Sequence, residues 1–322
     1  MQETQRKKME QKAHVIDLPV IDLTAPDQLS TAALIRQACV ETGFFYIVNH
    51  GIDKDLLNKL FDGARKFYSL PLEDKMKLAR KGNRGYTALY AEKLDPSPTA
   101  KGDPKESFYI GPLDSEAGKL NQWPSEELLP NWRSTMETYH RTALRAARSL
   151  LSLVALALDQ DEVFLKENGF MDSPMGFLRL LRYPGDLGGS NDQDILGASA
   201  HSDYGMMALL ATDGVPGLQV CRERDREPRI WEDVPHIEGA LIVNIGDMME
   251  RWTNGIFRST LHRVKPNGKE RYSAPFFIDP PEEFVVQCLE TCCSDSNPSR
   301  FPPIRAIDYL EERFRVTHAT AT

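Results

Sequence analysis

The 322-residue sequence predicts an α+β protein with a mostly helical first half and an antiparallel β-sandwich or barrel in its second half. Apolar residues recur at helical spacing through much of residues 15–170. From residue 171 the pattern changes to short β-prone runs that are separated by Gly, Pro, Asn and Asp. Neither GxGxxG nor GxxxxGK[ST] occurs, which argues against a parallel nucleotide-binding sheet.

The first half begins with a charged segment, and we expect residues 1–14 to form a flexible arm. Short apolar strands are predicted at 18–23 and 44–48. Helical spacing predicts four helices: one capped by Ser30 or Thr31, one after Gly51, a short one starting near Pro71, and one from Trp132 to about Leu158. Residues 15–170 are expected to pack on the 171–322 core as one integrated unit.

The second half contains seven β-prone runs with no helical pattern between them. They lie at residues 176–182, 206–211, 217–220, 240–245, 260–264, 272–278 and 284–286. The expected linkers are 92–105 and 184–197. The second linker directly precedes a histidine motif, so we expect it at the rim of a pocket.

Composition narrows the class of protein. The net charge of −8 argues against general affinity for nucleic acid, which needs a basic face. No apolar run approaches the roughly 20 residues that span a bilayer. The five cysteines are scattered and contain no CxxC pair, which favours a reducing compartment. We therefore expect a cytoplasmic protein, by default a monomer, that acts on a small molecule rather than on nucleic acid or a membrane.

Two short motifs sixty residues apart suggest a metal centre. On an extended strand, His201 and Asp203 point to the same side and can reach one ion, although an ordinary His–Asp hydrogen bond has the same spacing. With His262 they would make a two-histidine, one-carboxylate set, which suits a divalent iron and leaves half an octahedron open. Just downstream, Arg271 and Ser273 can hold an organic acid by a charge-assisted fork and a hydroxyl.

The whole sequence resembles the non-haem iron, 2-oxoglutarate-dependent dioxygenases of the isopenicillin N synthase-like group. The motifs that carry the resemblance follow in the family's order: LPVIDLT at 18–24, GFFYIVNHGI at 43–52, HSDYG at 201–205, RSTLHRV at 258–264 and RYSAPFFIDP at 271–280. The resemblance implies a distorted double-stranded β-helix (jelly roll) wrapped by N-terminal and flanking helices.

The resemblance also implies roles for individual residues. The Fe(II) ligands would be His201, Asp203 and His262, and the distal carboxylate of 2-oxoglutarate would be held by Arg271 and Ser273. Three open metal positions would then serve the chelating keto acid and O2.

Tyr183 matches the tyrosine that meets the co-substrate from the opposite strand. Leu181 stands where many members carry an asparagine, so this sequence departs from the family there. Asn244 and Asp247 match a family motif and are interpreted as supporting residues.

We therefore expect an Fe(II)- and 2-oxoglutarate-dependent oxygenase that hydroxylates or otherwise oxidises a small organic metabolite, releasing succinate and CO2. The resemblance suggests substrate contacts at Tyr86, Phe108, Ile110, Tyr204, Met206 and Phe277. Arg84 or Arg182 can pair with a substrate acid, and both are equally compatible with structural ion pairs. Two alternatives stay open: an iron oxidase of the same fold that needs no 2-oxoglutarate, and a non-catalytic ligand-binding jelly roll.

Overall fold

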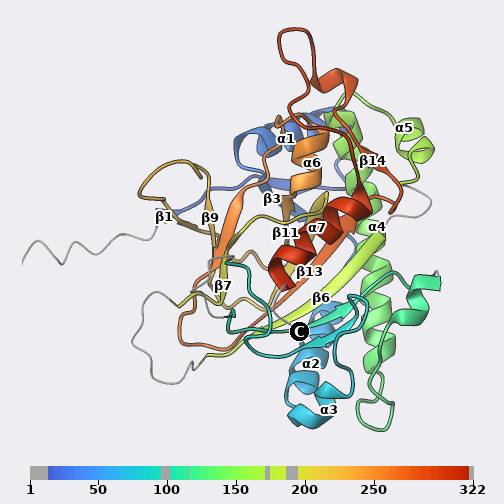
Figure 1. The fold of residues 1–322 in the computed structure, drawn as a ribbon, viewed down its shortest axis with the longest axis vertical. Helices are drawn as coiled ribbons and strands as arrows, with labels where there is room; N and C mark the ends of the chain where they lie inside the picture. The colour runs from blue at the N-terminus through green and yellow to red at the C-terminus, as the bar shows by residue number, and fades with distance from the viewer. Residues whose placement is uncertain (1–13, 96–101, 115, 171–174, 186–194, 319–322) are drawn as a thin grey trace, which may run out of the picture.

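The structure is a computed structural model that describes residues 14–95, 102–114, 116–170, 175–185 and 195–318. In these ranges, two large β-sheets form the centre of the molecule and helices cover its outside (Figure 1). Each of the seven strands expected in the second half is present, with bounds that differ by at most one residue. Most of the expected arm, residues 1–13, and residues 96–101 and 186–194 of the two expected linkers lie outside the described residues.

The larger sheet has eight strands in the order β2-β3-β11-β8-β13-β6-β5-β4. Its members are β2 (Val20–Asp22), β3 (Phe44–Val48), β4 (Gly85–Thr87), β5 (Glu106–Ile110), β6 (Met175–Tyr183), β8 (Met207–Thr212), β11 (Leu241–Ile245) and β13 (Arg271–Asp279). Strands from the first half of the chain extend this sheet at both edges. The two halves therefore share one sheet.

The smaller sheet has five strands in the order β1-β10-β9-β12-β7. Its members are β1 (His14–Val15), β7 (Ala198–His201), β9 (Leu218–Cys221), β10 (Glu232–Asp233) and β12 (Leu261–Val264). A two-stranded ribbon joins β14 (Val285–Val286) to β15 (Ile304–Arg305). Among the described residues of the five-stranded sheet, β7 is an edge strand and pairs with β12 alone.

The helices are α1 (Gln28–Glu41), α2 (Lys54–Tyr68), α3 (Leu72–Met76), α4 (Trp132–Ala157), α5 (Glu162–Glu167), α6 (Asp247–Trp252) and α7 (Ala306–His318). The cap expected at Ser30 or Thr31 is wrong, because α1 begins after Asp27, whose carboxylate accepts a hydrogen bond from the Ser30 amide at 3.0 Å. In the described residues, none of the helices combines the length and apolar character needed to cross a membrane.

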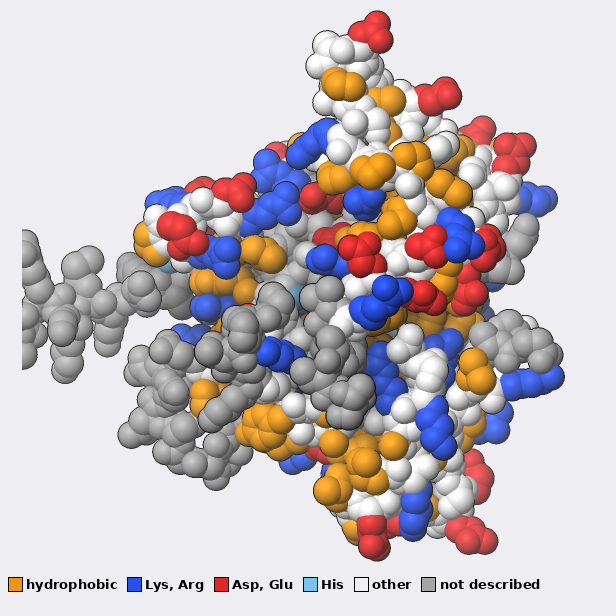
Figure 2. Space-filling view, viewed as in Figure 1, with side chains coloured by type: hydrophobic (Ala, Val, Ile, Leu, Met, Phe, Trp, Pro, Cys, Tyr) orange, Lys and Arg blue, Asp and Glu red, His pale blue; other side chains and the backbone are white. Residues whose placement is uncertain are grey.

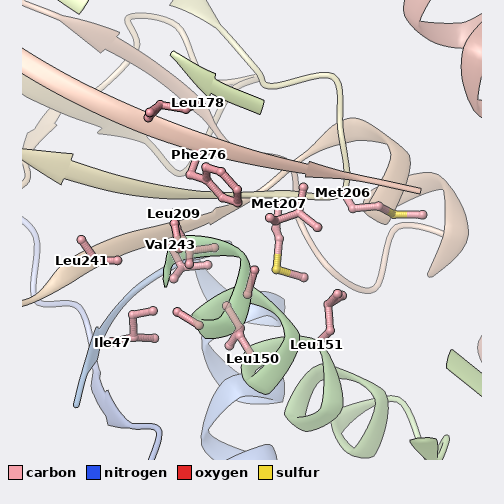
Figure 3. Packing of buried hydrophobic residues seen from close by; sticks show 14 of the residues in the cluster. Ile47, Leu150, Leu151, Leu178, Met206, Met207, Leu209, Leu241, Val243 and Phe276 are labelled. Carbon is pink, nitrogen blue, oxygen red and sulfur yellow. The ribbon is translucent and has the colours of Figure 1, made fainter. Parts of the chain in front are cut away.

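The main hydrophobic core lies between the eight-stranded sheet and the long helix α4. Figure 3 shows Leu150 and Leu151 of α4 facing Leu178, Leu209 and Phe276 from three sheet strands. Side chains alternate along a strand, so each strand that gives one residue to this core gives its neighbours to the opposite face. That opposite face borders the functional site.

Phe276 and Phe277 test this two-faced arrangement. Phe276 is fully buried in the core beside His140, whereas Phe277 is only partly buried and lines a cavity. We expect Phe276→Ala to lower the unfolding free energy by about 3–5 kcal/mol, because it leaves a cavity in a packed core. Phe277→Ala should cost about half of that or less. Urea unfolding of both variants measures the difference, and equal losses would contradict the assignment of the two faces.

Candidate active site

The pairing of β7 with β12 brings two histidines together. In this antiparallel pair His201 lies directly opposite His262, so both side chains point to the same face, and their ring centroids are 4.3 Å apart. Asp203 follows two residues after His201. Its Oδ1 atom lies 3.9 Å from Nε2 of His201 and 3.7 Å from Nε2 of His262.

Hydrogen bonds fix the orientation of all three side chains. The Nδ1 atoms of His201 and His262 contact the carbonyls of Ser199 and Thr260, at 2.7 and 3.1 Å. A proton on each Nδ1 leaves the lone pair of Nε2 directed at the common point. The Asn244 amide donates to Oδ2 of Asp203 at 2.7 Å.

The protonation state of His201 also favours metal binding. Burial, and then the neighbouring His262, lower the pKa of His201 to about 4, so this imidazole is neutral at pH 7. In the part of the chain that the structure describes, one group of His, Cys, Asp or Glu brings three ligand atoms within 4.8 Å of one another, and it is His201, Asp203 and His262. Two imidazole nitrogens and one carboxylate oxygen are a donor set that suits divalent iron.

The expected co-substrate residues lie together on the facing sheet. Arg271 and Ser273 are two residues apart on β13 and share a face, and Tyr183 of β6 lies opposite Arg271, with the guanidinium 5.1 Å from the tyrosine ring. Arg271 is buried, its Nε donates to the Val215 carbonyl at 3.2 Å, and its Nη1 has no hydrogen-bond partner. An unsatisfied buried donor is costly, and a ligand carboxylate would satisfy it.

Leu181 lies behind the cavity wall at this end of the site, in a small apolar cluster whose other members, Tyr183, Ala198 and Val264, line the cavity. It lies opposite Ser273 in the β6–β13 register and packs with Tyr183, Ala198 and Val264. The departure from the family's asparagine therefore replaces a polar group beside the Ser273 hydroxyl with hydrocarbon.

One cavity of about 320 Å³ joins the metal-ligand group, the Arg271–Ser273 pair and a wider region under α7. Of the six expected substrate contacts, Tyr204 and Phe277 line this cavity. Its wider part also includes residues that the sequence reasoning missed: Tyr109, Met175, Phe177, Arg179, Asp279, Leu310 and Phe314.

The other four expected substrate contacts do not line the cavity. Tyr86, Phe108, Ile110 and Met206 are at most 2% exposed and belong to the main core, where Phe108 packs against Phe67 and Trp132. The error for β5 is one of strand parity, because Phe108 and Ile110 face the helices. Tyr109 lies between them and reaches the cavity. The alternation of side chains along the strand places Tyr109 on the face opposite to Phe108 and Ile110, and this alternation could have identified it.

The two arginines expected to meet a substrate acid differ. Arg182 is held by Glu106 at 2.6 Å and by Glu270 at 2.7 Å, and it does not line the cavity. Arg84 lines the cavity and is 5% exposed. Of these two arginines, Arg84 is therefore the one available to a ligand.

Asp279 is a buried carboxyl on the cavity wall, at the end of β13 away from Arg271. Its Oδ1 has no hydrogen-bond partner. Burial, and then the Asp203 carboxylate, raise the pKa of Asp279 to about 7. The sequence could have indicated that Asp279 faces the cavity, because it follows Phe277 by two residues on the same strand and therefore shares its face.

The raised pKa of Asp279 predicts a pH-dependent stability. Between about pH 4 and 7 the folded state binds a proton that the unfolded state has released, so the free energy of unfolding falls as pH rises through this window. Asp279→Asn removes that loss. Relative to wild type, the variant should gain stability between pH 5 and pH 8, by roughly 3 kcal/mol at most. Urea unfolding of the metal-free proteins measures this gain, and a pH-independent difference would contradict it.

Comparisons with known proteins agree with this geometry. Two family profiles match: "non-haem dioxygenase in morphine synthesis N-terminal" over residues 18–126 and "2OG-Fe(II) oxygenase superfamily" over residues 176–280. Azadirone synthase LFS from Melia azedarach is 40% identical over 95% of this chain and 94% of its own length. The 2-oxoglutarate-Fe(II) type oxidoreductase hxnY from Emericella nidulans is 32% identical, covering 94% of this chain and 91% of its own.

Solved structures give the same result. A Neurospora crassa protein in complex with alpha-KG and thymine has a TM-score of 0.82 at 28% identity, over 95% of this chain and 99% of its own. JOX2 in complex with 2OG, Fe and JA has a TM-score of 0.80 at 28% identity, over 95% and 87% of the two chains.

The chain belongs to the 2OG-Fe(II) oxygenase family. It is an Fe(II)- and 2-oxoglutarate-dependent oxygenase that acts on small metabolites.

Proposed function

We propose that His201, Asp203 and His262 bind the iron, and that Arg271 and Ser273 hold the distal carboxylate of 2-oxoglutarate, with Tyr183 against its chain. One observation carries this proposal: three ligand atoms converge in the same cavity that contains a buried guanidinium with an unpartnered Nη1. Bound Fe(II), 2-oxoglutarate and O2 supply the oxidant that removes hydrogen from the substrate, with release of succinate and CO2. The two sheets would form the distorted jelly roll that frames this site.

The chain's own residues bind, orient and exclude water. Asn244 keeps Oδ2 of Asp203 occupied, so that Oδ1 stays directed at the ion. Arg271 would form a bidentate charge-assisted pair with the co-substrate, since its planar fork matches a carboxylate. Leu181, Ala198 and Val264 keep water from that pair, which strengthens it.

Anaerobic titration tests these roles. We expect the wild-type protein to develop the weak visible charge-transfer band of an Fe(II)–2-oxoglutarate chelate. Asp203→Ala should lose Fe(II) binding and turnover, because a third of the ligand set is gone. Arg271→Lys should keep Fe(II) but bind 2-oxoglutarate at least about tenfold more weakly, since a point charge replaces the planar fork. Full activity of Asp203→Ala would refute the ligand assignment.

For the substrate, we propose a small molecule with a largely apolar body and an acceptor oxygen that reaches Arg84. The guanidinium of Arg84 lies 4.7 Å from the Phe177 ring centroid. Its other face covers Gly111, where an added Cβ would lie 2.2 Å from Cζ. Nη1 donates to the Asn83 carbonyl at 3.1 Å and Nε has no partner. Burial lowers the pKa of Arg84, and the Glu282 carboxylate, which also lines the cavity, offsets this only in part. The burial of the guanidinium charge therefore favours a ligand oxygen nearby.

The relatives are consistent with such a substrate. The Neurospora crassa structure with thymine and the JOX2 structure with JA hold small organic molecules beside 2-oxoglutarate. Figure 2 shows basic and acidic side chains intermixed on the face in view, rather than one basic patch. We further propose a monomeric, cytoplasmic enzyme that binds no nucleic acid, in line with its five free thiols and net charge of −8.

Probe binding to the anaerobic Fe(II)–2-oxoglutarate protein tests the role of Arg84. Phenylacetate and phenylacetamide present an anionic and a neutral acceptor, while benzylamine has a similar shape without one. We expect the first two, but not benzylamine, to perturb the charge-transfer band. Arg84→Met keeps the stem on Phe177 but removes the donors, so the acceptor probes should bind at least about tenfold more weakly.

Arg182→Met is the matched control, because Arg182 is paired with glutamates outside the cavity. It should bind the probes as the wild type does. Equal probe affinity in Arg84→Met and wild type would contradict an acceptor site at Arg84.

A further inference from the structure

The buried carboxylate of Asp103, from the first half of the chain, accepts hydrogen bonds from β7, the strand that carries His201. Asp103 is 2% exposed and precedes β5. Its Oδ1 accepts hydrogen bonds from both the backbone N–H and the hydroxyl of Ser199, at 3.1 and 2.6 Å. The Ser199 carbonyl in turn contacts Nδ1 of His201 at 2.7 Å. Two residue-to-residue steps therefore connect Asp103 with a metal-ligand imidazole.

The position of β7 in its sheet makes this contact important. β7 is the edge strand, and its pairing with β12 is irregular between the His262 and Val264 positions. An edge strand lacks a neighbour on one side to fix its backbone. Asp103 accepts hydrogen bonds from both the backbone and the side chain of Ser199. In the described part of this sheet no further strand pairs with that side of β7, so Asp103 restrains its backbone there.

Asp103 is itself rigidly held. Its Oδ2 accepts from Lys105 Nζ at 2.6 Å and from the Leu94 amide at 3.3 Å. Lys105 also pairs with Glu92 at 3.2 Å, and Glu92 pairs with Arg179 of β6. Two buried anions and two buried cations thus balance one another, and the network ties Glu92, Asp103 and Lys105 to β6 of the larger sheet. A buried network of paired charges rigidifies the residues that it contacts.

We propose that Asp103 is a positioning residue for the metal centre: through Ser199 it sets the orientation of His201 and thereby the affinity for iron. This inference rests on the proposed role of His201 as a ligand. Residues that orient metal-bound histidines from behind commonly change metal affinity by about 10–100-fold when they are altered. Asp103 acts through one intervening residue, so the lower end of that range is expected.

Metal affinity in Asp103→Asn and a matched control tests the proposal. The asparagine keeps the size of the side chain, but its NH2 must face either the Ser199 donors or the Lys105 ammonium. Glu106→Gln is the control, because Glu106 is also buried and bound to a lysine, at 2.7 Å, but does not line the cavity and contacts neither β7 nor Ser199. Mn(II) binding, followed by loss of the free-ion EPR signal, gives Kd without 2-oxoglutarate or turnover.

Asp103→Asn should raise the Kd for Mn(II) about tenfold, whereas Glu106→Gln should change it less than about twofold, even if both variants melt at a lower temperature. If Asp103→Asn and Glu106→Gln change the Kd equally, or if Asp103→Asn leaves it unchanged, Asp103 has only a structural role in its ion pair and the inference is wrong. A wild-type chain that fails to bind Mn(II) would instead refute the ligand assignment itself, and the inference with it.

Ser199 offers a second pair of variants if Asp103→Asn does not fold. Ser199→Ala removes the hydroxyl but keeps the backbone hydrogen bond, so we expect a smaller rise in Kd, of about threefold. Ser199→Thr retains the hydroxyl and should restore wild-type affinity. An unchanged Kd in Ser199→Ala, or a loss that Ser199→Thr fails to restore, would contradict the pathway through Ser199.

Discussion

The antiparallel pairing of β7 with β12 is the constraint on which the site depends. It places His201 directly opposite His262, and the turn after β7 then brings the Asp203 carboxylate to both imidazoles. A shift of one residue in this register would turn one histidine to the other face of the sheet and remove the metal centre. The contacts of Ser199, Thr260 and Asn244 therefore protect a geometry that the edge position of β7 alone leaves weakly fixed.

Buried charge divides into two kinds around the cavity. Asp103, Lys105, Glu92 and Arg179 pair with one another and hold parts of the fold together. Arg271, Arg84 and Asp279 each retain a buried polar atom with no partner. Leaving such atoms unsatisfied costs stability, and proteins tolerate that cost mainly where a ligand completes the contacts. The unpartnered atoms of Arg271 and Arg84 therefore support the proposal that co-substrate and substrate bind there.

Much of this architecture could be predicted from the sequence, because its signals are local. Apolar periodicity identified α4 and the seven strands of the second half, and the spacing of His201, Asp203 and His262 identified a metal-ligand set. The residue types at 271 and 273 indicated a site for an organic acid, and the resemblance to a known family suggested that this acid is 2-oxoglutarate.

Other features depend on strand parity and on long-range contacts, which one sequence does not reveal. The segment 106–110 is buried on both faces and has an aromatic residue on each, so nothing local distinguishes Tyr109, which meets the cavity, from Phe108, which enters the core. From the sequence, Asp103 is predicted to be an ordinary loop residue, because it lies in the polar linker 92–105. Its contact with Ser199, 96 positions later, arises only when the two halves of the chain fold together. Arg84 and Arg182 likewise differ only through their distant partners.

A crystal structure grown anaerobically with Mn(II) and 2-oxoglutarate would show whether these residues form the metal and co-substrate site. We predict one anomalous peak bonded to Nε2 of His201, Nε2 of His262 and Oδ1 of Asp203, with the distal carboxylate of the acid on Arg271. An ion bound elsewhere, or an acid whose far carboxylate lies away from Arg271, would contradict it.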